Sequence, residues 1–200
     1  MDLKSTYNRI AADWFKDHNA DTWWQEGTNH FLSLLSKGAT ILDIGCGPGV
    51  TTRYLSDKGF RVTGMDFSEK MIEIAHREVP NIEFLVGDIY ELDSFNRTFD
   101  AIFAKAVLLH VPKDKVVSVL EKMRDKLNPG GLLYIAVKEN TKIDGEIVKE
   151  NDYGYEYERF FSYFTLPEVT AYLEKIGMKV VLGNIANSGK TNWIQVISQR

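Results

Sequence analysis

The stretch Thr40-Ile-Leu-Asp-Ile-Gly-Cys-Gly-Pro-Gly-Val-Thr51 decides the fold of this chain. Its opening apolar run predicts a buried strand, with Asp43 near the carboxyl end. Gly45, Gly47 and Gly49 then alternate with other residues, so the backbone can turn sharply and approach a ligand closely. The residues that follow predict a helix. A strand, a glycine turn and a helix together form the ligand-binding corner of a doubly wound α/β domain.

The spacing of the glycines argues against a dinucleotide fingerprint, whose third glycine would stand at position 50, where this chain has valine. The pattern is instead Asp-x-Gly-x-Gly-x-Gly. It resembles the first motif of the class I S-adenosylmethionine-dependent methyltransferases, of the small bacterial type with a methyltransferase domain. A carboxylate at the strand end can accept hydrogen bonds from the ammonium group of that cofactor. The resemblance implies a cofactor contact at Asp43, Gly45, Cys46, Gly47 and Gly49; a glycine-rich connection in another α/β protein is the alternative.

Composition indicates a single globular domain of 200 residues, with 44% hydrophobic residues and a formal net charge of −4. The sequence contains no run of Lys or Arg that would indicate binding of nucleic acid, so a nucleic-acid partner is not expected. The lone Cys46 excludes an intrachain disulfide and is expected to be a small packing residue, and the scattered histidines predict no metal site. No signal peptide and no apolar run of about 18 residues is found, so we expect a cytoplasmic protein without a membrane partner.

Two amphipathic helices are predicted before the first strand, over 2–16 and 21–37. The run Tyr-Asn-Arg-Ile-Ala-Ala-Asp-Trp at 7–14 resembles the N-terminal segment that many small-molecule methyltransferases fold over the cofactor. By this resemblance Tyr7 faces the site. The alternative is that the aromatic residues of both helices only pack against the core.

The resemblance also implies the architecture of the whole chain. We expect an α/β fold with a doubly wound, Rossmann-like sheet of seven strands, mostly parallel and with an antiparallel last strand. Residues 1–38 are expected to form a helical lid, and residues 39–200 the cofactor-binding methyltransferase domain. The tetrapeptide at 128–131, Asn-Pro-Gly-Gly, predicts a turn before the fifth strand.

An acid ends the second predicted strand. Asp66 lies 21 residues after Gly45, where a βα fold places a carboxylate that holds two ribose hydroxyls. A cap for the next helix is the alternative role. Phe67 and Met71 are then near enough to pack on the adenine, although Met71 also suits the core.

The third predicted strand ends in Gly87, Asp88 and Ile89. In the family, the acid of this pair accepts a hydrogen bond from the adenine amine, and the next residue adds a backbone N–H and an apolar contact. A simple Gly-Asp turn is the alternative.

The fourth predicted strand, 99–104, lies beside the first across the point where the strand order reverses. The segment 105–112 resembles the fourth motif of the family, and this places Ala104, Lys105 and His110 near the methionine part of the cofactor. Lys105 departs from the small or amide residue of the family pattern; binding of an anionic substrate and exposure to solvent are both open. His110 is interpreted as a structural histidine, with general-base chemistry as the alternative.

Residues 139–164 are polar and then aromatic, and we expect them to rise from the carboxyl edge of the sheet as part of the substrate wall. Their Arg-Phe-Phe-Ser-Tyr-Phe run resembles a segment of many bacterial members. Candidates for a general base, needed only where the acceptor enters protonated, are Tyr7, His110, Tyr155 and Glu156.

The sequence therefore predicts transfer of a methyl group from S-adenosylmethionine to a small-molecule acceptor, which leaves S-adenosylhomocysteine. A tRNA or protein acceptor is one alternative, and a non-catalytic sensor of the cofactor or of a nucleotide is another. Neither the acceptor nor the oligomeric state can be read from the residues.

Overall fold

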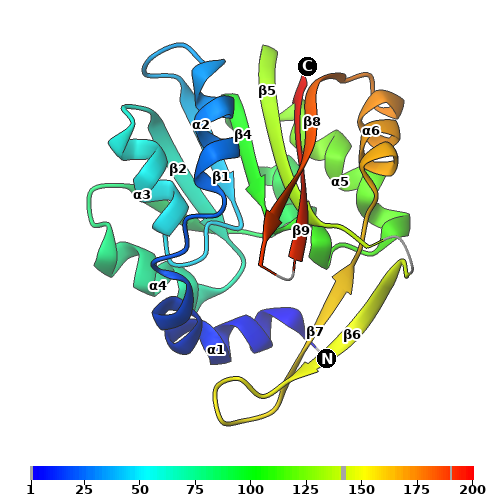
Figure 1. Cartoon of the computed structure of the whole chain (residues 1–200). Helices are drawn as coiled ribbons and strands as arrows, with labels where there is room; N and C mark the ends of the chain where they lie inside the picture. The colour runs from blue at the N-terminus through cyan, green and yellow to red at the C-terminus, as the bar shows by residue number, and fades with distance from the viewer. Residues whose placement is uncertain (1, 141–142, 190) are drawn as a thin grey trace.

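A seven-stranded sheet forms the centre of the molecule (Figure 1). The computed structural model describes residues 2–140, 143–189 and 191–200. In spatial order the strands are β3 (Glu83–Val86), β2 (Arg61–Asp66), β1 (Thr40–Ile44), β4 (Phe99–Lys105), β5 (Leu127–Lys138), β9 (Thr191–Gln199) and β8 (Lys179–Ser188). The strands β1 to β5 pair in parallel, and β9 runs antiparallel to both of its neighbours. The predicted Rossmann-like sheet with an antiparallel last strand is confirmed.

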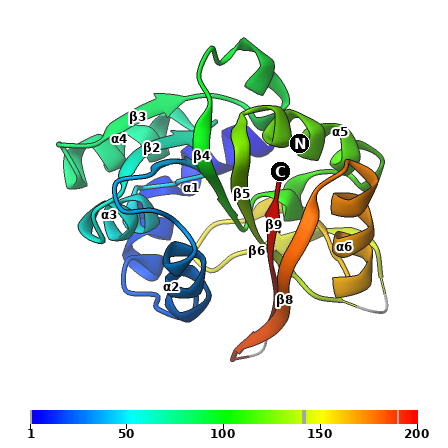
Figure 2. The ribbon, with the colours of Figure 1, turned by 90° about the horizontal axis from the view of Figure 1, so that it is seen from above.

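Helices cover both faces of this sheet. They are α2 (Gln25–Ser33), α3 (Val50–Asp57), α4 (Glu69–Glu78), α5 (Lys113–Asp125) and α6 (Leu166–Lys175), with short 3₁₀ turns η1 (Ile89–Ser94) and η2 (Leu108–His110). Figure 2 shows α2 and α3 on one face and α5 and α6 on the other. Among the helices of the described ranges, none is long and apolar enough to cross a membrane.

The strand order reverses between β1 and β4. From β1 the chain moves outward to β2 and β3, and it then returns to the other side of β1 as β4. The connections that leave β1 and β4 therefore diverge at the carboxyl edge of the sheet and leave a crevice there. Such a crevice is where open α/β sheets bind their ligands.

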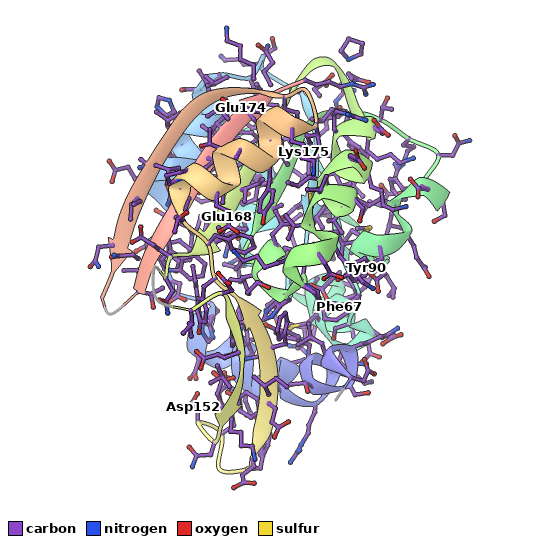
Figure 3. All side chains as sticks on the ribbon, turned by 90° about the vertical axis from the view of Figure 1, so that its right-hand side faces the viewer. Phe67, Tyr90, Asp152, Glu168, Glu174 and Lys175 are labelled. Carbon is purple, nitrogen blue, oxygen red and sulfur yellow. The ribbon has the colours of Figure 1, made fainter. Side chains whose placement is uncertain are left out.

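Two further elements lie beyond this carboxyl edge (Figure 1). They are α1 (Leu3–His18) and an antiparallel hairpin of β6 (Gly145–Glu150) and β7 (Tyr157–Ser162). Asp152 marks the turn at the far end of the hairpin (Figure 3). The sequence predicts an insertion over 139–164 but not its strands, and positions 141–142 of that prediction lie outside the described residues.

The second helix differs from its prediction in both length and place. It spans Gln25–Ser33 rather than 21–37, and it begins at Trp24 without a side-chain cap. Phe31 is fully buried, and its ring centroid lies 5.7 Å from that of Phe103 and 5.6 Å from that of Tyr134. Because these two rings belong to β4 and β5, α2 is part of the core layer, whereas α1 lies at the edge of the sheet.

The fifth strand also begins earlier than predicted, because Asn128 to Gly131 are included in β5 instead of forming a turn before it. Gly130 adopts a φ of 78°, and the register with β4 shifts between Phe99 and Ala101. The irregular pairing of β5 with β4 thus accommodates Gly130 and Gly131 within the strand.

We expect Phe31→Ala to lower the free energy of unfolding by about 3–5 kcal/mol, since it opens a cavity between α2 and the sheet. Urea denaturation measures this change. The control is Leu34→Ala, at a side chain that is 44% exposed, where a cost within about 0.5 kcal/mol is expected. Equal costs for the two variants would contradict the placement of α2 in the core.

Candidate active site

A cavity of about 600 Å³ lies at the carboxyl edge of the sheet, between the strand ends, α1 and the hairpin. Its wall comes from the β1–α3 turn, the ends of β2, β4 and β5, the loop after β3, α1 and β7. Most of the predicted cofactor residues line it: Asp43, Gly45, Cys46, Gly47, Asp66, Phe67, Met71, Asp88, Ile89, Lys105 and His110. The structure therefore brings together residues that are separated by up to 67 positions in the chain (110 minus 43).

The glycine turn requires glycine both because its backbone packs closely against neighbouring side chains and because its φ angles are positive. Gly45 has a φ of 66°, and a Cβ atom there would lie 2.3 Å from a methyl carbon of Val107. Gly49 is the N-cap residue of α3, with a φ of 84°. Pro48 therefore lies just before the helix. Larger residues at Gly45 or Gly49 would strain the backbone and displace neighbours.

Asp43 is the buried acid at the end of β1. It is 2% exposed, and one of its carboxylate oxygens accepts a 2.7 Å hydrogen bond from the hydroxyl of Thr52. Burial raises the pKa of Asp43 to about 7, although Thr52 and Lys105 favour the charged form. A carboxyl group held in this way gains from a cationic ligand group, which would replace the lost hydration.

Asp66 is the corresponding acid at the end of β2. Its two oxygens accept 2.9 Å hydrogen bonds from the backbone N–H groups of Gly47 and Ser68. Burial raises the pKa of Asp66 to about 6, against the effect of these two donors. Asp66 thus ties the glycine turn to β2, while Ser68 itself caps α4.

The remaining predicted adenine contacts gather on one side of the cavity. Asp88 is half-buried, and its carboxylate accepts a 2.9 Å hydrogen bond from the N–H of Tyr90. Phe67 is half-buried, with its ring edge-on to that of Tyr7 at 5.7 Å. Figure 3 shows Phe67 near α1. Met71 is buried and packs with residues of α1 as well as lining the cavity.

Three predicted cofactor residues have other neighbours. Gly49 and Ala104 are not among the residues of the cavity wall; Ala104 is fully buried in the core. Cys46 is buried and packs in a small cluster with apolar residues of α4 and β3. Burial raises the pKa of its thiol well above its usual range, which disfavours the reactive thiolate.

Tyr7 and His110 form a hydrogen bond where α1 and the hairpin cover the cavity; these two elements are called the cover below. The Nδ1 atom of His110 lies 2.7 Å from the carbonyl oxygen of Phe160, so Nδ1 carries the proton. Its Nε2 atom therefore accepts the 2.7 Å hydrogen bond from the hydroxyl of Tyr7. Burial lowers the pKa of His110 to about 3 and, together with Tyr7, makes the ring a neutral structural acceptor.

Arg159 of β7 completes this network. It donates a 3.3 Å hydrogen bond to the hydroxyl of Tyr7, and its guanidinium forms a two-armed ion pair with Glu150 of β6. The side chains of the pair are 15% and 17% exposed. Helix α1, the η2 turn and the hairpin are thus joined by Tyr7, His110 and Arg159.

Polar contacts also hold α1 at both of its flanks. On one flank the amide of Asn8 donates to Glu69 and its oxygen accepts from the hydroxyl of Ser68, at 2.9 and 2.7 Å. On the other flank Arg9 donates to the backbone carbonyl of Glu156 at 3.1 Å. The helix therefore bridges the start of α4 and the hairpin.

Tyr155 and Glu156 do not reach the cavity, because both lie near the turn of the hairpin. The hydroxyl of Tyr155 donates to Asp13 at 2.9 Å, and Arg9 lies 4.3 Å above its ring. The side chain of Glu156 is exposed. Neither residue is placed to take a proton from an acceptor in the cavity.

The sequence did not single out Arg159, Lys138, Phe161 or Trp193, which all line the cavity. Arg159 and Phe161 belong to the aromatic run that the sequence assigns to the substrate wall only as a segment, whereas Lys138 and Trp193 lie outside that run. Within the described ranges, no group of three or more His, Cys, Asp or Glu residues is arranged to hold a metal ion.

Comparison with known proteins shows similarity to methyltransferases. Residues 41–131 match the family model of a methyltransferase domain. YqeM, a putative methyltransferase of Bacillus subtilis (strain 168), is 37% identical over 116 residues, which are 56% of this chain and 47% of that protein. A ubiquinone biosynthesis O-methyltransferase of Coxiella burnetii is 35% identical over 139 residues, which are 61% of this chain and 58% of that protein. The chain spans about half the length of the curated relatives it matches.

Solved structures agree with the fold. The 1,6-didemethyltoxoflavin-N1-methyltransferase of Burkholderia thailandensis, crystallised with 1,6-didemethyltoxoflavin and S-adenosylhomocysteine, superposes with a TM-score of 0.80 at 21% identity, over 99% of this chain and 87% of that chain. The magnesium protoporphyrin IX methyltransferase of Synechocystis PCC 6803 with bound S-adenosylmethionine gives 0.75 at 16% identity, over 100% and 98%.

The order of the strands, the crevice beside β1 and the acid-led glycine turn define a class I methyltransferase fold. Residues 41–131 are thus similar to a methyltransferase domain, and 56–61% of the chain is similar to proteins named as methyltransferases.

The raised pKa of Asp43 predicts a pH dependence of stability. The folded state holds the proton between pH 3.8 and about 7, where the unfolded chain releases it. The contribution of Asp43 to stability is therefore fully present below pH 3.8 and is lost as the pH rises through about 7. We expect the free energy of unfolding of the wild type to fall, relative to Asp43→Asn, over this interval.

Urea denaturation across this pH range measures the difference, whose slope cannot exceed about 1.4 kcal/mol per pH unit for one carboxyl group. Asp57→Asn, at the exposed end of α3, is the control and should run parallel to the wild type. Parallel curves for Asp43→Asn and the wild type would contradict the raised pKa.

Proposed function

We propose that this protein transfers the methyl group of S-adenosylmethionine to a small-molecule acceptor. The observation that carries the proposal is the convergence of two buried carboxyl groups, Asp43 and Asp66, with the glycine turn on one cavity at the switch point. A cofactor with an ammonium group, a ribose and an adenine matches the chemistry of this wall. When bound, it supplies an electrophilic methyl group that an acceptor displaces directly.

Different residues of the cavity wall would bind different groups of the cofactor. Asp43 lies where it can accept from the ammonium group, directly or through water, and Gly47 exposes bare backbone to the ligand. Asp66 has acceptor positions left on both oxygens for the ribose hydroxyls. Asp88 and Ile89 would meet the adenine edge, with Phe67 against its face.

The cover of the cavity favours a small acceptor. Helix α1 and the hairpin lie across the carboxyl edge and are joined there by Tyr7, His110 and Arg159. A bound acceptor would thus be enclosed with the cofactor, which aligns the reacting atoms and excludes water. Relatives whose names state small molecules, such as the ubiquinone biosynthesis enzyme of Coxiella burnetii, support the same class of acceptor.

The choice of cofactor is tested by isothermal calorimetry with S-adenosylhomocysteine and with NAD. We expect binding of S-adenosylhomocysteine and much weaker or no binding of NAD, because the chain has valine where the third glycine of a dinucleotide site would stand. Tighter binding of NAD would defeat the proposed function.

Asp66→Ala tests the ribose contact by the same measurement. Each lost charge-assisted hydrogen bond should cost about 1.5–3 kcal/mol of binding free energy for S-adenosylhomocysteine. Asp57→Ala, which removes an exposed acid from the end of α3, is the matched control and should bind as the wild type does. Unchanged affinity in a folded Asp66→Ala variant would leave Asp66 with only its role in holding Gly47.

Helix α1 is proposed to act as a lid over this site. Since α1 lies outside the sheet and lines the cavity, we expect hydrogen exchange in residues 3–18 to slow when S-adenosylhomocysteine binds. Exchange in α6, away from the cavity, should not change. Deletion of residues 1–20 should weaken cofactor binding, and full affinity and turnover after that deletion would refute the lid.

A further inference from the structure

The wall of the cavity is charged in two halves. Three of its buried or half-buried carboxylates, Asp43, Asp66 and Asp88, lie at the carboxyl ends of β1, β2 and β3, and a fourth, Asp21, precedes α2. Two lysines, Lys105 and Lys138, end β4 and β5 on the other side of the switch point. The proposed cofactor contacts lie mainly in the acidic half, which leaves the lysine half for the acceptor.

The register of the sheet places both lysines on one face. Lys105 is the partner of Ala136, and Lys138 lies two residues further along the same strand. Likewise, Asp43 is the partner of Phe103, two residues before Lys105. Since side chains two residues apart on a strand point to the same face, Lys105 and Lys138 are diagonal neighbours, with Asp43 on the far side of Lys105.

Aromatic rings support both ammonium groups. The Nζ atom of Lys105 lies 5.6 Å from the ring centroid of Trp23 and 5.4 Å from that of Trp24. The Nζ atom of Lys138 lies 4.1 Å from the ring centroid of Phe161. Cation–π contacts hold an ammonium group in place, but they neither neutralise its charge nor use up its hydrogen-bond donors.

The donors of these two lysines are not used by the part of the chain that the structure describes, where neither Nζ atom has a hydrogen bond or a salt bridge. Arg159 differs, because Glu150 neutralises it. Burial lowers the pKa of both lysines, and the charge of Arg159 lowers that of Lys138 further. The carboxylates of Asp43 and Asp21 oppose the shift for Lys105, and those of Glu150 and Glu146 oppose it for Lys138. Ammonium groups that are partly desolvated and lack acceptors bind an anion favourably.

We propose that Lys105 and Lys138 form an anion subsite, and that the acceptor is a small organic acid whose carboxylate or phosphonate group binds there. This inference rests on the proposed function. The neighbouring rings of Phe161 and Trp193 would pack against the apolar body of the acid.

The experiment uses the protein loaded with S-adenosylhomocysteine and three probes of similar shape: benzoate, phenylphosphonate and the neutral benzamide. Dissociation constants come from ligand-observed NMR titration. We expect both acids to bind at least about tenfold more tightly than benzamide. Lys105→Met and Lys138→Met should each weaken the acids about tenfold and leave benzamide unchanged. Lys179→Met removes an exposed charge at the start of β8, outside the cavity wall, and should change nothing.

Acids that bind no more tightly than benzamide, or that fail to bind at millimolar concentration, would overturn the anion subsite. Wild-type affinity for the acids in the folded Lys138→Met variant would do the same, and this variant decides the question if Lys105→Met does not fold. Binding of S-adenosylhomocysteine alone is measured in parallel. Its failure in the wild type would defeat the proposed function, whereas its success without a preference for acids defeats only the present inference.

Discussion

The burial of Asp43 and Asp66 at the ends of adjacent strands is the constraint on which the site depends. Carboxylates removed from water are costly unless they are hydrogen-bonded or paired. The structure compensates only in part, with the hydroxyl of Thr52 and the N–H groups of Gly47 and Ser68. Both acids therefore keep raised pKa values, of about 7 and about 6. A ligand with a positive charge and hydroxyl groups would supply the hydrogen bonds and the counter-charge that these two buried carboxyl groups lack.

The same constraint explains why the acid-led glycine turn predicts so much of the fold. A buried strand, positive φ at the glycines and an acid on the next strand are local requirements, and residues 40–66 satisfy them in sequence. The first strand, the glycine turn and the acid of the second strand could be predicted because each depends on periodicity or on a short spacing. The strand order, the last antiparallel strand and several residues of the cavity wall were instead implied by the resemblance to the methyltransferase family.

The remainder depends on long-range packing, which the sequence does not encode locally. The same aromatic spacing suits a lid and a core helix, and only the contact of Phe31 with Phe103 and Tyr134 assigns α2 to the core. The β6–β7 pairing arises from a polar segment without clear alternation, so its strands were missed. Lys138 became visible only through its register with β4, which places it near Lys105.

The ion pair of Arg159 with Glu150 has a further consequence for the cover of the cavity. Both residues belong to the β6–β7 hairpin, so the hairpin carries its own counter-charge. Separation of the hairpin from α1 breaks the contact of Arg159 with Tyr7 but leaves the guanidinium paired. The hairpin can therefore separate from α1 without leaving the buried guanidinium of Arg159 unpaired, which would otherwise cost about 3–5 kcal/mol.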